Sequence, residues 1–102
     1  MSDINIELGG GKAEEAIDED GTIFSFETAA RTVSVVNTGS VTVYVACGSV
    51  TAAALAQRMT DGTALPILAG RAFTFEATYP RLRGLGVITS AGETGEVAFG
   101  AF

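Results

Sequence analysis

The side chains that most often carry enzymatic chemistry are scarce in this sequence. Histidine is absent and Cys47 is the only cysteine, so the chain lacks the commonest general base and zinc ligand and has no second thiol for an internal disulfide. A cysteine nucleophile needs a base beside it, so we expect Cys47 to be a small buried residue at a strand end. The sequence therefore predicts a protein that is not an enzyme and uses no cofactor or metal.

Carboxylates are the only plentiful acid–base groups. Glu27 and Glu76 each follow a Phe-x-Phe segment, on the polar face of an expected strand. A glycosidase needs two carboxylates facing each other across a cleft, and nothing in the spacing brings these two together. We therefore expect both glutamates on a solvated outer face.

Two further segments resemble binding motifs only in part. Asp18-Glu19-Asp20-Gly21 matches the start of a calcium-binding loop, but the residues after it read as a strand. Gly9-Gly10-Gly11-Lys12 lacks the spacing of a phosphate-binding loop. We expect the first to be a solvated or partner-facing acidic segment and the second to be a flexible hinge.

The acidity of the chain is concentrated near its N-terminus. The formal net charge is −6, yet residues 1–30 hold eight acidic residues against one lysine, a net of −7. A chain this acidic is a poor binder of nucleic acid. The first residues lack the basic and apolar regions of a secretory signal, and no apolar run is long enough to cross a membrane. We expect a protein made in the cytoplasm, with no nucleic-acid or membrane partner.

From Thr22 onward, apolar and polar residues alternate with the period of β-strands. The segments 22–27, 32–37, 41–45 and 71–77 show this pattern, and 82–89 and 96–102 continue it less regularly. Asn37-Thr38-Gly39-Ser40 has the composition of a tight turn, so Thr32–Val45 is predicted to be a β-hairpin. Residues 50–59 could be a short helix, a loop or an irregular edge strand, and a loop with one helical turn is favoured.

Strands of this kind must bury one apolar face against a second sheet. We therefore predict an all-β fold, a jelly-roll-like β-sandwich of seven or eight short antiparallel strands, with residues 22–102 as the sandwich domain. Residues 1–21 are predicted to form an acidic N-terminal arm or extended segment, with Ile4–Leu8 as a candidate first strand. The predicted core consists of Phe24, Phe26, Val33, Val35, Val41, Val43, Val45, Phe73, Phe75, Leu85, Val87, Val97 and Phe99.

Three arginines and the last residue are candidates for a partner interface. Arg71, Arg81 and Arg83 lie in the near-neutral body, where they could bind carboxylates of a partner or pair with Glu76 or Glu96 as ordinary surface residues. Phe102 is apolar and needs cover from its own core or from a neighbouring subunit.

The layout of residues 22–102 resembles small β-sandwich virion proteins of tailed bacteriophages, especially capsid decoration (cement) proteins. The resemblance depends on the Asn37-Thr38-Gly39 turn segment, the Pro66-Ile67-Leu68-Ala69-Gly70 turn before a Phe-x-Phe strand, and the final Val97-Ala98-Phe99 strand. It implies a non-enzymatic protein on the outer surface of an assembled capsid, made in the host cytoplasm. It also implies that the chain binds the lattice of the major capsid protein, as a homo-oligomer with a trimer favoured.

Under this resemblance, the predicted docking surface combines the N-terminal segment with the arginines and the final residue. Its members are Ile4, Ile6, Leu8, Arg71, Arg81, Arg83 and Phe102. The alternative is a ligand- or glycan-binding module of a phage tail, head fibre or secreted enzyme. That alternative needs exposed aromatic side chains, for which Tyr44 and Tyr79 are the candidates.

Overall fold

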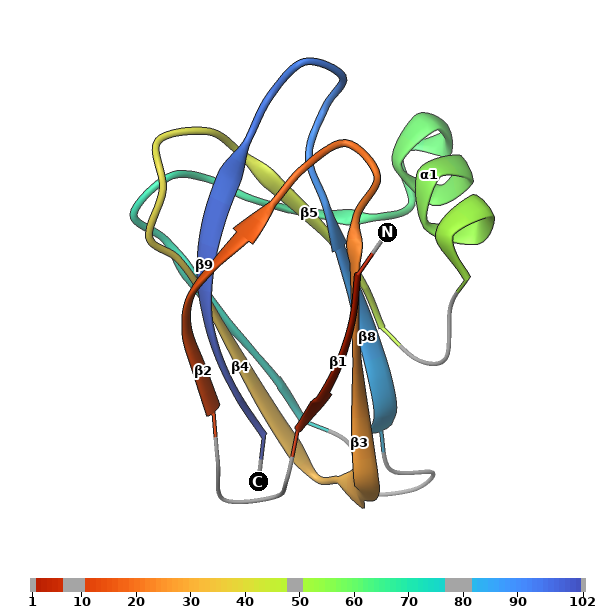
Figure 1. Ribbon diagram of the computed structural model, residues 1–102, viewed down its shortest axis with the longest axis vertical. Helices are drawn as coiled ribbons and strands as arrows, with labels where there is room; N and C mark the ends of the chain where they lie inside the picture. Colours follow the sequence, from red (N-terminus) through yellow and green to blue (C-terminus); the bar gives the residue numbers. More distant parts are fainter. Residues whose placement is uncertain (1, 7–10, 48–50, 77–81, 102) are drawn as a thin grey trace.

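The computed structural model describes residues 2–6, 11–47, 51–76 and 82–101 of the chain, and these form two packed β-sheets with one helix on the outside (Figure 1). The elements are β1 (Ser2–Ile6), β2 (Gly11–Ile17), β3 (Thr22–Ala30), β4 (Thr32–Asn37), β5 (Val43–Cys47), α1 (Ala52–Asp61), β6 (Leu65–Ile67), β7 (Ala72–Glu76), β8 (Leu82–Ile88) and β9 (Gly95–Ala101).

The order of the strands is that of a jelly roll. One sheet has the order β2-β9-β4-β7, and the other has β3-β8-β5-β6 with β1 added at its edge beside β3. The chain therefore crosses repeatedly between the sheets, as in the double Greek key of jelly rolls. The predicted all-β sandwich is confirmed. The described residues form nine strands where seven or eight were expected, and β1 pairs with β3 in parallel rather than antiparallel.

The N-terminal segment belongs to the sandwich over its described residues. β1 pairs with β3, and β2 pairs with β9 at an edge of the four-stranded sheet. Ile17, at the end of β2, is completely buried in the core. The expected arm thus contributes a strand to each sheet.

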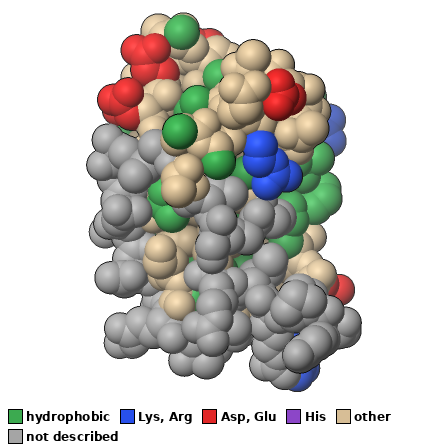
Figure 2. Space-filling model, turned by 90° about the vertical axis from the view of Figure 1, so that its right-hand side faces the viewer, with side chains coloured by type: hydrophobic (Ala, Val, Ile, Leu, Met, Phe, Trp, Pro, Cys, Tyr) green, Lys and Arg blue, Asp and Glu red, His purple; other side chains and the backbone are tan. Residues whose placement is uncertain are grey.

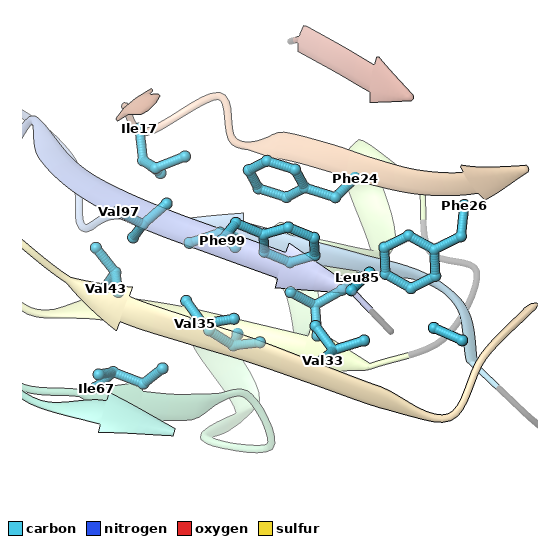
Figure 3. Close-up of a cluster of buried hydrophobic side chains, with 14 residues drawn as sticks. Ile17, Phe24, Phe26, Val33, Val35, Val43, Ile67, Leu85, Val97 and Phe99 are labelled. Atoms are coloured by element: carbon cyan, nitrogen blue, oxygen red, sulfur yellow. The ribbon is translucent and has the colours of Figure 1, made fainter. Parts of the chain in front are cut away.

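The core between the sheets is built around stacked phenylalanines (Figure 3). The rings of Phe24 and Phe99 are nearly parallel, with centroids 4.2 Å apart, and Phe26 stacks on Phe99 at 5.8 Å. Because Phe24 comes from the five-stranded sheet and Phe99 from the other, this stack joins the two layers. Ten of the predicted core residues are buried: Phe24, Phe26, Val33, Val35, Val43, Val45, Leu85, Val87, Val97 and Phe99.

The predicted hairpin over Thr32–Val45 is wrong. β4 pairs with β7 and β9, whereas β5 pairs with β6 and β8 in the opposite sheet. The buried Asn37 side chain fixes the crossing, since its amide donates to the carbonyl oxygens of Val41 and Ile67, each at 2.8 Å, and its oxygen accepts from the Gly39 amide at 3.1 Å. The turn residues therefore carry the chain between sheets instead of folding it back on itself.

The preference for a loop at residues 50–59 is also wrong, because α1 has ten residues. The Thr51 hydroxyl caps its first turn by accepting from the Ala54 amide at 3.2 Å, and Gly62 ends it in the left-handed conformation with φ 76°. Leu55 is completely buried on the outer face of the five-stranded sheet, against Ile23, Ala46 and Ile88, with Tyr44 and Met59 partly buried beside them.

Three predicted core residues are more exposed than expected. Phe73 is 42% exposed, Phe75 is half-buried, and Val41 is half-buried. Phe73 and Phe75 lie on β7, the outermost strand of its sheet. The strand that faces β7 across the core, β6, is also an edge strand and has three residues. The strand predicted at residues 71–77 is present as β7, but alternation of apolar and polar residues does not distinguish an edge strand from a central one.

Candidate partner-binding surface

The two ends of the sandwich differ in charge. We call the end that carries the β2–β3 turn and the β8–β9 loop the apical end. It presents the exposed acids Asp18, Glu19, Asp20 and Glu93, and acidic side chains appear at the upper end in Figure 2. The Asp18 carbonyl accepts from the amides of Gly21 and Thr89, which ties the turn to the loop. The acidic segment is therefore a hydrogen-bonded turn of the sandwich.

The opposite, basal end is where β1, β3, β7 and β9 finish and β2, β4 and β8 begin (Figure 1). The register shows this directly, since Ile6 pairs with Phe26, Gly11 with Gly100, and Thr32 with Glu76. Arg31 is exposed between β3 and β4 at this end. Of the charged residues on described segments, Lys12, Arg31 and Arg83 lie toward the basal end, and so do the acids Glu27 and Glu76.

The structure brings some of the predicted interface positions to the basal end and leaves others apart. Ile6 is the last residue of β1 and Arg83 lies near the start of β8, so both positions are basal. Ile4 and Ile6 pair with Phe24 and Phe26 of β3. Leu8, Arg81 and Phe102 lie outside the described residues.

Arg71 does not belong to the basal group. It is exposed and directly precedes β7, whose first residue pairs with Val36 near the end of β4. Arg71 therefore lies on the apical side of β7, separated from the basal end by the length of that strand.

The β7 edge is the feature that the sequence analysis missed. The rings of Phe73 and Phe75 contact each other with centroids 4.7 Å apart, and Phe73 is among the exposed large hydrophobic residues together with Leu68. The other edge strand on this side, β6, contains Pro66, which lacks the amide hydrogen that a further strand would use. No comparable blocking residue occurs in Ala72–Glu76.

The residues singled out for chemistry are not assembled into a site within the described part of the chain. Glu27 lies in β3 and Glu76 in β7, which belong to different sheets. Cys47 ends β5 beside Leu85. Among the residues whose placement is described, no group of three or more histidine, cysteine, aspartate or glutamate side chains could hold a metal ion.

Two further findings concern the alternative of a ligand- or glycan-binding module and the question of a membrane span. Tyr44 is half-buried beside α1, so it does not form an exposed aromatic platform, and Tyr79 lies outside the described residues. No helix in the described ranges is long and apolar enough to span a membrane.

Comparisons with known proteins identify no family or relative for this chain. The chain matches no protein-family model, no curated protein and no solved structure.

Proposed function

We propose that this protein is a non-enzymatic structural component of a phage particle that decorates the assembled capsid and stabilises it by binding its outer surface. The observation that supports this most is the polarity of the sandwich. Three basic residues that are far apart in the sequence, Lys12, Arg31 and Arg83, lie toward one end together with Glu27 and Glu76, and the four exposed acids Asp18, Glu19, Asp20 and Glu93 occupy the other.

Such polarity suits a protein that binds a large surface in one orientation. The basal end would dock on carboxylates of the major capsid protein lattice, for which arginine is well suited. The acidic apical end would then point to solvent, where like charges on neighbouring copies discourage further association. The proposed location is the capsid surface of the virion, after synthesis in the host cytoplasm.

Stabilisation follows from mass action. A protein that binds the assembled lattice but not the separate subunits lowers the free energy of the assembled state. Repeated sites and a homo-oligomeric binder would add avidity, so that each single contact need not be strong. The proposal requires no catalysis, cofactor, nucleic acid or membrane.

Charge changes at the basal end should weaken capsid binding. We expect the double variant Arg31→Ala/Arg83→Ala to co-sediment with capsids stripped of bound surface proteins at least about tenfold more weakly than the unmodified chain, since it removes two cations from the docking end. The matched control is Ala53→Glu/Ala56→Glu, which changes the net charge by the same amount at two exposed positions of α1. Circular dichroism checks that all variants are folded.

The control separates docking from general electrostatics. Equal loss of binding in both double variants would show that only net charge matters, and binding unaffected by the arginine changes would contradict basal docking. If the unmodified chain does not co-sediment with capsids, the proposed function itself is contradicted.

A further inference from the structure

We propose that the free edge of β7 binds the β7 edge of a second copy of this chain, in antiparallel register about a two-fold axis at Thr74. The surface consists of Ala72–Glu76, which has strand β4 on one side and is the outermost strand of the sheet on the other. The inference concerns the isolated protein and does not depend on capsid binding.

The hydrogen bonds of β4 show which groups of β7 are available. The Asn37 amide donates to the Arg71 carbonyl at 2.8 Å, and the Thr38 amide donates to the Glu96 carbonyl of the strand on the other side. Bonding directions alternate along a strand. The backbone groups of Phe73 and Phe75 therefore point toward β4, and those of Ala72, Thr74 and Glu76 point to the free edge.

This free edge is complementary to itself in one antiparallel register. With Thr74 opposite Thr74 of the second copy, Ala72 lies opposite Glu76, and the outward amides and carbonyls of all three residues are paired. Registers centred on Phe73 or Phe75 leave some of these groups unmatched. The hydrogen-bonding pattern therefore selects a two-fold axis at Thr74.

The side chains favour the same register. Each Phe73 lies opposite Phe75 of the second copy, in the non-hydrogen-bonded pairs where side chains approach most closely. Phe73 is 42% exposed in the single chain, so the pairing removes apolar surface from water. Aromatic pairs across two strands are among the more stabilising side-chain pairs in sheets.

Charge also distinguishes antiparallel from parallel pairing. Arg71 precedes the strand and Glu76 ends it, and both are exposed. Antiparallel pairing places Arg71 of one copy and Glu76 of the other at the same end of the interface, one position out of register and on opposite faces of the sheet, so the opposite charges are nearer than in parallel pairing although the two side chains do not face each other. Parallel pairing would instead place like charges together.

Disulfide trapping at a single position tests the register. Residues opposite each other in a hydrogen-bonded pair have Cα atoms about 5.5 Å apart, within the range that a disulfide spans. With Cys47 replaced by serine in both cysteine variants, the full-length Thr74→Cys variant should therefore form a covalent dimer under oxidised glutathione. The Ala72→Cys variant is the matched control, because in this register its two cysteines lie about four residues apart along the strand, roughly 13 Å, and it should stay non-covalent.

A backbone variant tests the hydrogen bonds of the free edge. Thr74→Pro removes an amide that points to this edge and leaves the backbone bonds between β4 and β7 in place. It also removes the exposed contact of the Thr74 hydroxyl with that of Ser34 at 3.4 Å. We expect sedimentation equilibrium to show a dimer for the unmodified chain, and a dimer weakened at least about tenfold for Thr74→Pro, since two hydrogen bonds are lost by symmetry.

Several results would overturn the inference. A monomer at millimolar concentration or a trimer for the unmodified chain would exclude the two-fold pairing, as would cross-linking that is equal in the Thr74→Cys and Ala72→Cys variants. The trimer is the state that the resemblance to decoration proteins implies. Because these measurements use purified protein, their failure leaves the capsid-binding test unaffected.

Discussion

Replacing Phe24 with alanine is expected to lower the free energy of unfolding by about 3–5 kcal/mol. Phe24 is completely buried and stacks on Phe99 of the facing sheet at 4.2 Å. Removing the ring leaves a cavity where the two layers meet, and its neighbours are held by strands that cannot close the space. Urea unfolding followed by circular dichroism measures the change, which is a large part of the stability expected for a domain of this size.

The control for this prediction is Phe73→Ala. It removes the same ring from the edge strand β7, where the side chain is 42% exposed, so it should cost much less, on the order of 1 kcal/mol. If the two variants lost equal stability, the sandwich would not be held together by the Phe24–Phe99 stack.

Replacing Asn37 with aspartate should destabilise the protein by about 3–5 kcal/mol at neutral pH. The Asn37 amide is completely buried and donates to two carbonyl oxygens, of Val41 and Ile67. A carboxylate of the same shape cannot donate to either, and it would be held close to two partial negative charges. The change removes the bonds that guide the chain from β4 into the opposite sheet.

The loss of stability in Asn37→Asp should depend on pH. Burial and the two carbonyls raise the pKa of the new carboxyl in the folded state above its value in the unfolded chain. The folded state then binds more protons than the unfolded state, so stability falls as pH rises through this interval and recovers as pH is lowered. Protonation restores one donor, so recovery should be incomplete.

Gln57→Glu is the matched control, since it makes the same amide-to-acid change at an exposed position. The Gln57 amide donates to the Asp61 carboxylate at 2.8 Å on the surface of α1, and its replacement should cost about 0.5 kcal/mol. A small and pH-independent effect of Asn37→Asp would mean that Asn37 does not control the crossing.

The fold class could be predicted from the sequence because the strands of this protein are strongly patterned. Alternation in segments such as 32–37 and 41–45 placed Val33, Val35, Val43 and Val45 in the core, and the structure buries all four. What alternation cannot supply is the partner of each strand. β4 and β5 face each other across the core, and both present valines to it, so the pattern of a hairpin and that of a crossing are the same.

The helix was missed although its end signals are present in the sequence. Thr51 caps the first turn and Gly62 ends the last, while Leu55 and Met59 are spaced to lie on one helical face. The all-β pattern around residues 50–59 favoured a loop. The contact of Leu55 with the outer face of the sheet decides the structure, and this contact is not visible in the sequence.

The candidate surface was only partly predictable, for a similar reason. Charge counting identified an acidic N-terminal region but could not show that Asp18 and Glu93, far apart in the sequence, share one end of the sandwich. Phe73 and Phe75 were assigned to the core because their strand pattern is that of buried residues. Their position at a sheet edge depends on the order of all the strands in the sheet.

The most direct measurement of the proposed role is the copy number of this chain in particles purified from cells that produce it, by quantitative mass spectrometry against the major capsid protein. The proposal predicts a fixed ratio set by the number of equivalent positions on the shell, and exposure of the chain to proteases added outside intact particles. A chain that is absent from the particles, or present in variable trace amounts while abundant in the soluble cell fraction, would contradict it.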